Sequence, residues 1–389
     1  MNILFAIDSF FDGGAEIFAI RLANEMSKYN NVYFIELETF YSEKKEQLSL
    51  LNKTIRLFQP DYNYKLHVFR FLQKKRFFKI LFYKMRIESK DIKKRIIINY
   101  LKKNKIDIVH SHSWNPDMYF AGIKKTYNFK LLSSLHGHYE IEPYKSPPFS
   151  DITRKLINKI DHVIYLTNDH LKTFSAFNYP TLKMSKIFYG FDKAPTSQIT
   201  NWNKEKPLRL ILISRAIPEK GWEQAIEAVC EMQSEGKNIM LDLLGDGPVL
   251  NELKLKYEKL SFIHFRGFQI NIDQFLEMAH LSLLPTYYYA ESLPNSIIEY
   301  LSHGKPVIAT DIAAIREMID TNGNQAGILF DGKRGEIVDK NNIKEAIYIY
   351  YTHPEKITID SQHAIEAYKK FEMRKCVENY QIIYNNLLE

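Results

Sequence analysis

A chain of 389 residues and 45.9 kDa is long enough for two or three domains, and its 45% hydrophobic content is typical of a globular protein. Two cysteines, Cys230 and Cys376, are too few for a disulfide framework and suit a reducing compartment. The chain contains no stretch of about 18 uncharged apolar residues, and its first residues lack the basic start of a signal peptide. We therefore expect a cytoplasmic protein without a transmembrane helix.

The net charge of +7 is concentrated in one segment. Residues 65–105 contain fifteen Lys or Arg and two acidic residues, so this segment carries +13 and the rest of the chain carries −6. The cations are mixed with Phe, Leu, Ile and Tyr, which is typical of helices that lie on anionic membrane surfaces. A nucleic-acid interface and a solvated helical face are the alternative interpretations.

The first half of the chain alternates short apolar runs with helical stretches. Apolar runs that predict buried strands span residues 2–8, 31–37, 106–113, 129–138, 160–167 and 183–191. A helix is predicted over 17–29. This alternation predicts a parallel sheet with helices on both faces. Residues 192–207 are polar and lose the periodicity, so we expect a linker there.

The same alternation restarts at Leu208. Strands are predicted over 208–214, 239–248, 262–268, 281–287 and 305–310, with helices between them. We expect two doubly wound α/β domains of similar size, residues 1–191 and residues 208–370. An amphipathic helix is predicted over 371–389.

Several residues that suit a phosphate-bearing ligand follow directly after predicted strands, where open α/β sheets bind their ligands. Gly14 in "DGGAE" and Gly245 in "LLGDGP" allow close approach of the backbone to a ligand. Arg215 and Lys220, five positions apart in "SRAIPEKGW", could together bind a diphosphate. Taken singly, an ordinary glycine turn and two solvated charges would also explain these residues.

The segment "ESLPNSIIEYLSHGKPVIAT" places Glu291 and Glu299 eight positions apart, with a helix predicted to start between them. Amides from Leu293 to Asn295, with Pro294 in the first turn, would point out of the helix N-terminus towards phosphate. Glu299 would lie about 9 Å along the axis from that end. If the ligand is a nucleotide sugar, Glu291 could hold the sugar and Glu299 the ribose. An acidic first turn plus a solvated charge is the alternative.

The ordered set of "RAIPEKG", "GDGP", Glu-x7-Glu and "GKPVIAT" resembles the retaining glycosyltransferases of family 4, also called glycosyltransferase group 1. The resemblance spans nearly the whole chain and is strongest from Leu208 to Phe330. It implies the GT-B fold, in which two Rossmann-like domains face each other across a cleft and a C-terminal helix returns to the N-terminal domain. It also implies a hexosyltransferase that uses a nucleotide diphosphate sugar and retains anomeric configuration, without an essential metal or other cofactor.

The resemblance implies roles for individual residues. Arg215 and Lys220 match the diphosphate-binding pair, Glu291 the carboxylate beside the donor sugar, and Glu299 the ribose ligand. His136 in "SLHGHY" matches a histidine that faces the donor sugar near its reacting carbon. On this basis His136, Arg215, Lys220 and Glu291 are the expected catalytic residues. The expected donor-binding residues are Gly14, Gly245, Leu293, Pro294, Asn295 and Glu299.

One stretch departs from the family pattern. Many relatives have a glycine-rich segment where this chain has "ESLPNS", so Ser292 and Asn295 are departures from the family pattern at the expected phosphate-binding amides.

The motifs "VHSHSW" and "LHGHY" raise the alternative of a metal centre. A binuclear hydrolase usually has an aspartate two positions after the second histidine, but Trp114 follows His112 at that position and Asp117 comes later. The chain also lacks the Asp-x-Asp motif with which the other major glycosyltransferase fold holds a metal–diphosphate. We therefore expect no metal site, and interpret His110 and His112 as polar strand-end or acceptor-site groups.

The basic segment lies in the half of this fold that takes the acceptor, which favours a lipid-linked acceptor and peripheral association with the inner face of the cytoplasmic membrane. The expected function is therefore sugar transfer in bacterial surface polysaccharide biosynthesis. A UDP-sugar is favoured because it is the commonest donor, and a GDP-sugar is possible. A nucleotide-sugar epimerase or phosphorylase on the same fold is the main alternative, and a nucleic-acid-binding protein is a less favoured one.

Overall fold

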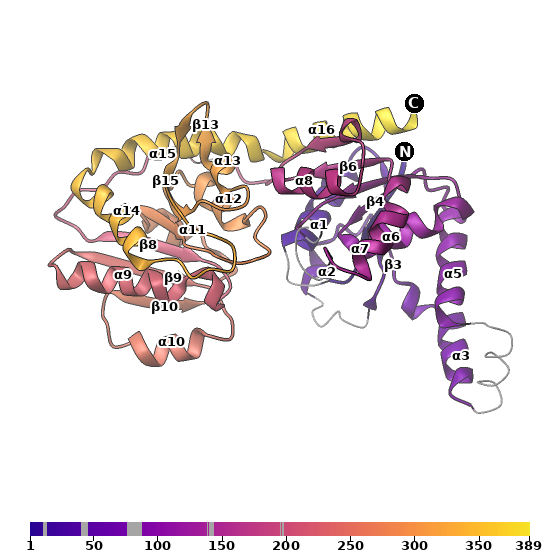
Figure 1. Ribbon diagram of the computed structural model, residues 1–389, viewed down its shortest axis with the longest axis horizontal. Helices are drawn as coiled ribbons and strands as arrows, with labels where there is room; N and C mark the ends of the chain where they lie inside the picture. The colour runs from indigo at the N-terminus through magenta and orange to yellow at the C-terminus, as the bar shows by residue number, and fades with distance from the viewer. Residues whose placement is uncertain are drawn as a thin grey trace. The chain divides into compact units, whose positions relative to one another are not determined.

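The computed structural model describes residues 1–10, 14–39, 46–75, 88–137, 139, 144–194, 196 and 198–389. These residues form two compact units (Figure 1). Unit 1 combines Met1–Gly190 with Met373–Glu389, and unit 2 is Phe191–Glu372.

Unit 1 contains, within its described residues, a seven-stranded parallel sheet in the order β3-β2-β1-β4-β5-β6-β7. The strands are β1 (Asn2–Ile7), β2 (Asn31–Glu36), β3 (Arg56–Phe58), β4 (Ile108–His112), β5 (Lys130–Ser134), β6 (His162–Tyr165) and β7 (Met184–Lys186). The strand order reverses between β1 and β4, so the carboxyl ends of these two strands mark the position where such sheets bind ligands.

Helices cover both faces of this sheet. The helices of unit 1 are α1 (Gly14–Met26), α2 (Glu46–Leu50), α3 (Tyr64–Gln73), α5 (Ser89–Lys103), α6 (Trp114–Ile123), α7 (Phe149–Leu156), α8 (Asn168–Ala176) and α16 (Met373–Leu388). Short 3-10 helices are η2 (Pro60–Tyr62), η3 (Lys124–Thr126), η5 (Ile157–Lys159) and η6 (Thr181–Lys183).

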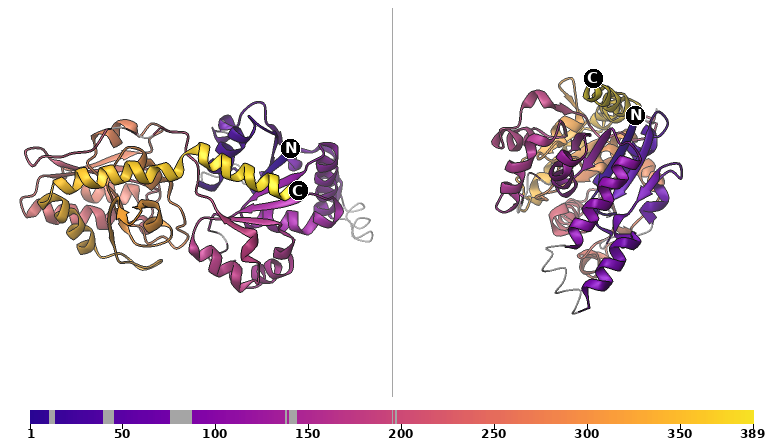
Figure 2. Two further views of the ribbon diagram at one scale, coloured as in Figure 1. Left: turned by 90° about the horizontal axis from the view of Figure 1, so that it is seen from above. Right: turned by 90° about the vertical axis from the view of Figure 1, so that its right-hand side faces the viewer.

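The alternation of side chains along each strand explains the two cores of unit 1. On one face, Leu4 and Val109 pack with α5, α6 and α8 in a cluster that includes Ile97. On the other face, Phe5 and His110 lie with their ring centroids 5.0 Å apart. The C-terminal helix α16 reaches this second face and packs against α1 (Figure 2).

Unit 2 contains, within its described residues, a six-stranded parallel sheet in the order β10-β9-β8-β11-β12-β15. The strands are β8 (Leu208–Ile213), β9 (Ile239–Leu244), β10 (Ile263–Gly267), β11 (Leu281–Leu284), β12 (Val307–Thr310) and β15 (Gly327–Phe330). A small antiparallel pair joins β13 (Asp320–Thr321) to β14 (Asn324–Gln325). The order reverses between β8 and β11, so the carboxyl ends of this pair mark a second expected ligand position.

The helices of unit 2 also cover both faces of its sheet. They are η7 (Pro218–Lys220), α9 (Trp222–Ser234), α10 (Leu250–Tyr257), α11 (Asp273–Met278), α12 (Asn295–Ser302), α13 (Ile315–Ile319), α14 (Lys340–Thr352), α15 (Glu355–Tyr368) and η8 (Lys369–Phe371). Leu210 and Leu241 pack with Trp222 of α9 and Ile347 of α14 in one apolar cluster. On the opposite face, Tyr300 of α12 is fully buried.

The prediction of two Rossmann-like α/β units, with a C-terminal helix returning to the first, is confirmed. Two details differ. The short strands β3 and β15 were not predicted, because each has only three or four residues beside polar turns. The C-terminal helical pattern is broken at Glu372, where the backbone is extended between η8 and α16. Between residues 192 and 207 the described residues form no helix or strand.

Candidate active site

Two predicted charged residues, Lys220 and Glu291, meet in unit 2. Lys220 ends η7 after β8 and Glu291 follows β11, yet Lys220 Nζ lies 2.5 Å from Glu291 Oε2. Both side chains are buried, and Thr286 Oγ1 donates a hydrogen bond of 2.9 Å to the same carboxylate oxygen. Because β8 and β11 are neighbours where the strand order reverses, the pair occupies the position at which open α/β sheets bind ligands.

The loop after β8 is held against the loop after β11. The Tyr287 amide donates a 2.8 Å hydrogen bond to the Glu219 carbonyl oxygen. Gly221 has φ +70°, and a Cβ atom there would lie 2.2 Å from the Pro285 carbonyl oxygen. Only glycine permits that approach. The contact between the two loops therefore fixes the position of Lys220.

Arg215, the third predicted group, shares an aromatic neighbour with Lys220. Its guanidinium carbon lies 5.3 Å from the centroid of the Tyr288 ring, and Lys220 Nζ lies 5.1 Å from the same centroid. Cations are attracted to the face of an aromatic ring, so Tyr288 helps to position both. Arg215 remains exposed to solvent. Sequence reasoning missed Tyr288, although the aromatic run "TYYYA" directly before Glu291 was a usable signal.

Gly245 has a structural reason to be glycine. It follows β9 with φ +142°, and a Cβ atom would lie 1.9 Å from the carbonyl oxygen of Ser214. The absent side chain therefore allows the loop after β9 to pack against the backbone beside Arg215. The close approach that the structure describes is between two loops of the protein.

The helix N-terminus that follows Glu291 differs from the expectation in one respect. Helix α12 starts at Asn295, and Pro294 occupies the N-cap position without a side-chain cap. Pro294 was expected among the amide donors, but proline has no N–H. The amides of Leu293, Asn295 and Ser296 make no hydrogen bond within the described residues. These amides are the donors that this end of α12 can offer to an anion.

Two buried polar atoms near this helix end also lack a protein partner. Ser292 Oγ and Asn295 Oδ1 have no hydrogen-bond partner within the described part of the chain. Buried polar groups are nearly always hydrogen-bonded in native proteins, so such atoms indicate a place where a bound molecule could supply the partner.

Glu299 lies on α12, four residues after its start. At about 1.5 Å per residue, this distance along the axis is about 6 Å, shorter than the 9 Å expected from a start near Leu293. The side chain is half-buried. Its carbonyl oxygen accepts hydrogen bonds from Ser302 Oγ and His303 Nδ1 at 2.8 and 2.9 Å, which close the C-terminal end of the helix.

His136 follows β5 in unit 1, and both of its ring nitrogens already have partners. Nε2 lies 3.0 Å from His112 Nδ1, and Nδ1 is hydrogen-bonded to the Tyr189 hydroxyl. Phe18 of α1 stacks on Tyr189 with ring centroids 4.3 Å apart. The imidazole is therefore held in place from two sides. To bond to a ligand through a ring nitrogen, it must give up one of these partners.

Two carboxyl groups that sequence reasoning missed lie near the point where the strand order of unit 1 reverses. Burial raises the pKa of Glu16, in the first turn of α1, to about 7. Burial also raises the pKa of Asp8, which follows β1 and accepts a 2.8 Å hydrogen bond from Asn115 Nδ2. A carboxyl group that titrates near neutral pH, as Glu16 does, is a candidate for proton exchange. Gly14, the first residue of α1, is exposed beside them in sequence.

The other histidines of the two His-x-His motifs are packed inside unit 1. Burial lowers the pKa of His110 and of His112 well below the ordinary value, so both rings are neutral at neutral pH. His110 is hydrogen-bonded to Ser134 Oγ and to the Tyr384 hydroxyl of α16, each at 2.7 Å. His138 lies outside the described residues. Among the residues described, no group of three or more His, Cys, Asp or Glu side chains could hold a metal ion.

Comparison with protein families identifies both halves of the chain. The model described as "Glycosyltransferase Family 4" matches residues 12–194, and the one described as "Glycosyl transferases group 1" matches residues 207–347. These matches cover most of both α/β units. The chain is a family 4 glycosyltransferase.

This glycosyltransferase has relatives in surface polysaccharide biosynthesis. It is 24% identical to the O-antigen biosynthesis glycosyltransferase WbnH of Escherichia coli over 293 residues, which are 74% of this chain and 78% of WbnH. It is also 30% identical to an uncharacterized glycosyltransferase of Methanocaldococcus jannaschii over 240 residues, or 55% of this chain and 58% of the relative.

Its fold matches that of solved glycosyltransferases. The crystal structure of HepE from Anabaena in complex with UDP superposes with a TM-score of 0.76 at 17% identity, covering 99% of this chain and 100% of HepE. The likeness confirms the GT-B fold. In the described part of this glycosyltransferase, every helix is too short or too polar to span a membrane.

Proposed function

We propose that this glycosyltransferase transfers a sugar, with retention of anomeric configuration, from a UDP-sugar to a lipid-linked glycan acceptor in bacterial surface polysaccharide biosynthesis. A GDP-sugar is the alternative donor. The observation that carries the proposal is the convergence of Arg215, Lys220 and Glu291 at the strand-order reversal of unit 2. The complexes of the fold relative HepE with UDP and with UDP-glucose favour a uridine donor. The O-antigen relative favours the acceptor class.

Stabilisation of the departing diphosphate carries most of the proposed catalysis. The bond between the anomeric carbon and the diphosphate oxygen breaks, and the acceptor oxygen bonds to the same face of that carbon. Arg215, Lys220 and the amides of Leu293 and Asn295 offset the charge that develops on the diphosphate. The departing phosphate oxygen takes the acceptor proton, so no side chain has to act as a strong base. Because the protein supplies these cations and amides, we expect the transfer to proceed without a metal ion.

Glu291 has one oxygen to offer the donor sugar. Lys220 and Thr286 both contact Oε2, whereas Oε1 has no hydrogen-bond partner in the described part of the chain. In the proposed site, Oε1 accepts hydrogen bonds from sugar hydroxyl groups while Lys220 holds the carboxylate in place. Glu299, further along α12, binds the ribose hydroxyls.

The remaining predicted residues keep the roles that the family resemblance implies. Gly14 belongs to the glycine loop near the acceptor and donor phosphates, and Gly245 keeps the loop beside Arg215 compact. His136 orients the donor near its reacting carbon.

The basic segment supports an anionic membrane surface as a partner and a location at the inner face of the cytoplasmic membrane. Helices α3 and α5 pack against each other (Figure 2). Tyr64, Val68 and Phe71 recur at helical spacing on α3 and are 71%, 45% and 61% exposed. Lys74 and Lys75 are exposed beside them. Exposed aromatic residues flanked by cations suit the interface of an anionic bilayer.

Not every cation of the segment is available to a partner. Lys93 is buried and bonded to Glu38 and Asp61, and Arg70 pairs with Asp61 at 2.9 Å. Residues 76–87, which carry further cations, lie outside the described residues.

The test of the proposed function starts with donor binding and ends with product. A thermal-shift screen of UDP- and GDP-sugars on the full chain identifies the donor, because a ligand that binds the folded state raises the melting temperature. The radiolabelled donor is then incubated with the enzyme and bacterial membranes. We expect label in the lipid fraction with wild-type protein, and almost none with Arg215→Ala.

Two outcomes of this test would refute the proposal. Conversion of the donor to a free sugar phosphate or to an isomeric nucleotide sugar, without labelled lipid, would indicate a phosphorylase or an epimerase. Tight binding of nucleic acid at physiological salt, without binding to membranes, would argue for a nucleic-acid-binding role.

A further inference from the structure

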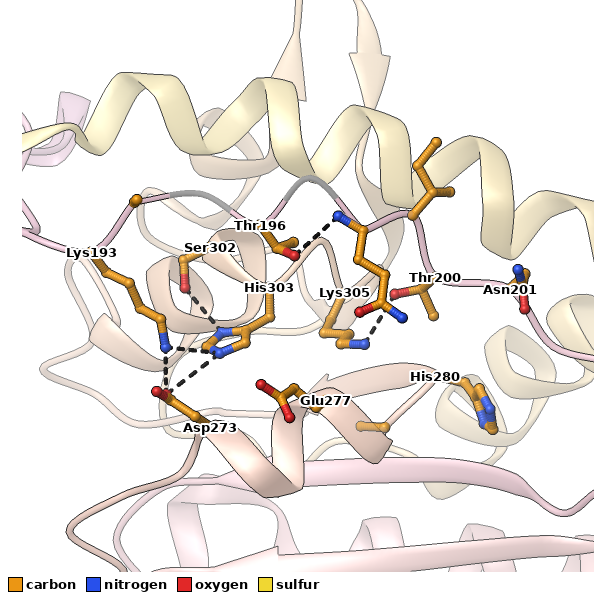
Figure 3. A pocket seen from close by; sticks show the side chains of 14 residues that line it. Lys193, Thr196, Thr200, Asn201, Asp273, Glu277, His280, Ser302, His303 and Lys305 are labelled. Carbon is orange, nitrogen blue, oxygen red and sulfur yellow. Dashed lines mark hydrogen bonds and ion pairs between the residues drawn. The ribbon is translucent and has the colours of Figure 1, made fainter.

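Unit 2 contains a pocket at the amino ends of its strands β11 and β12. The Lys220–Glu291 pair lies at the opposite side of the sheet, beyond the carboxyl ends of the strands. The pocket has a volume of about 410 Å³ and is lined by the segment around Thr200, by α11 and by the residues that precede β11 and β12 (Figure 3). His280 stands directly before β11, and Lys305 stands two residues before β12. The donor-side residues instead follow the carboxyl ends of the strands. The pocket is therefore separate from the proposed donor site.

Lys305 brings a buried ammonium group to this pocket. Its side chain is only 6% exposed. Its Nζ donates a 3.0 Å hydrogen bond to Thr200 Oγ1, which in turn donates to the Gly304 carbonyl oxygen at 3.1 Å. Burial lowers the pKa of Lys305 to about 8, so the group still carries its charge at neutral pH. An ammonium group has three donors, and Thr200 is its one hydrogen-bond partner among the described residues.

His280 adds a neutral donor to the same half of the pocket. Its Nδ1 accepts a 2.9 Å hydrogen bond from the Arg209 amide. Burial and the nearby cations Lys305, Arg209 and Lys206 lower the pKa of His280 to about 4, so the ring is neutral and carries its proton on Nε2. Asn201 is exposed at the same end of the pocket. In Figure 3, His280 and Asn201 lie on the same side of the pocket as Thr200 and Lys305, and Glu277 lies between Lys305 and Asp273.

The other half of the pocket satisfies its own polar groups. Lys193 forms an ion pair with Asp273 and donates a 2.9 Å hydrogen bond to His303 Nε2. His303 Nδ1 donates to the Glu299 carbonyl oxygen at 2.9 Å. Unused donors and positive potential are therefore found beside Lys305. The exposed carboxylate of Glu277 is the nearby opposite charge.

We propose that the Lys305 half of this pocket is a binding site for a small oxyanion, the phosphate or carboxylate group of a metabolite. Lys305 and His280 donate hydrogen bonds to the anion, and Asn201 closes the site from the solvent side. A buried ammonium group gains most from an oxyanion partner, because charge-assisted hydrogen bonds are about twice as strong as neutral ones. The volume of the pocket falls in the range of small-molecule sites.

The test is calorimetric titration of inorganic phosphate and, separately, of acetate into the full chain at constant ionic strength. Because phosphate could also enter the donor site, the titration is repeated on protein saturated with UDP and on the Arg215→Ala variant. Lys305→Met removes the ammonium group, and Asn201→Asp places a negative charge at the mouth of the pocket. Asn251→Asp makes the same change at an exposed position of α10, outside the pocket, as the matched control.

We expect one phosphate site that persists in Arg215→Ala and with UDP bound. Lys305→Met and Asn201→Asp should each weaken it about tenfold or more, whereas Asn251→Asp should not. Acetate binding with the same dependence on Asn201 would identify a carboxylate ligand, and binding of phosphate alone would identify a phosphate ester. Absence of binding at millimolar anion, or equal affinities of the two aspartate variants, would overturn the proposal. If Lys305→Met does not fold, the two aspartate variants still decide.

Discussion

Lys220 and Glu291 form a buried ion pair with an N–O distance of 2.5 Å, although 71 residues separate them in the chain. Each charge balances the other, so neither is left without a counter-charge in the interior of unit 2. The pair therefore stabilises the loops that carry the proposed donor site, and its effect on stability can be separated from its proposed effect on activity by mutation.

Changing one partner of this pair should reduce both stability and activity. Lys220→Met or Glu291→Leu leaves the other group buried without its partner, which typically costs about 3–5 kcal/mol of unfolding free energy. The double variant Lys220→Met, Glu291→Leu should recover most of that stability, because two apolar side chains replace two charges. It should still lack transfer activity. The wild type, the two single variants and the double variant are compared by urea denaturation and by a transfer assay. A double variant whose loss of unfolding free energy equals the sum of the two single losses would contradict the prediction.

Arg215→Ala should affect activity without affecting the fold. The side chain is exposed, so we expect a change in unfolding free energy within about 0.5 kcal/mol. Transfer should fall about 10²–10³-fold, as is typical when one preorganised donor to a developing charge is removed. Arg374→Ala, an exposed change on α16, is the control and should leave both quantities unchanged. Equal activity of the two variants would remove Arg215 from the proposed mechanism.

Gly245 should tolerate no side chain. Gly245→Ala combines a disfavoured φ of +142° with a contact of 1.9 Å between the new Cβ and the Ser214 carbonyl oxygen. We expect it to lower the unfolding free energy by about 1–3 kcal/mol or more. Gly122→Ala is the matched control, because nothing lies within 4 Å of a Cβ atom there. Since Gly122 is helical, that change should stabilise the protein by about 0.5–1 kcal/mol. Thermal melts of the two variants should therefore shift in opposite directions.

The buried carboxyl of Asp117 should make stability depend on pH. Burial raises its pKa from 3.8 to about 7, and it is bonded to Ser111 and Tyr139. Between these two values the folded protein keeps a proton that the unfolded chain has lost. The stabilisation from this group is thus fully present below its unfolded pKa and is lost as the pH rises through about 7.

Asp117→Asn isolates this contribution. Unfolding free energies of wild type and variant are measured by urea denaturation from mildly acidic pH to above pH 7. The wild type should lose stability relative to the variant over that interval. Two parallel pH profiles would show that Asp117 does not titrate as its burial suggests.

The exposed face of α3 should contribute to membrane binding. Phe71→Ser removes an apolar side chain that would otherwise enter the interface, worth about 1.5–3 kcal/mol when fully buried. We expect it to lower co-sedimentation with anionic vesicles roughly tenfold. Phe268→Ser is the matched control, since Phe268 is 72% exposed in unit 2 and Phe71 is 61% exposed. Equal loss in both variants, or binding to neutral vesicles as strong as to anionic ones, would argue against an electrostatic membrane site at α3.

The two α/β units and the residue types of the candidate site could be predicted from the sequence alone. Apolar runs such as 2–8 and 208–214 indicate burial, and glycines and cations after strands indicate candidate ligand positions, because these signals depend on neighbours in the chain. The order of motifs from Arg215 to Glu299 was equally visible. This order of motifs indicates the family without any knowledge of the distances between the residues.

Which of these residues are in contact could not be predicted from the sequence. The ion pair of Lys220 with Glu291, the shared ring of Tyr288 and the engagement of both nitrogens of His136 depend on how separate loops pack, which no local pattern encodes. The same holds for the pocket beside Lys305, a residue that reads in sequence as one more cation near a proline. Lys305 is buried because the strands of unit 2 and the segment around Thr200 pack against it. This burial makes the lysine a candidate for binding an anion.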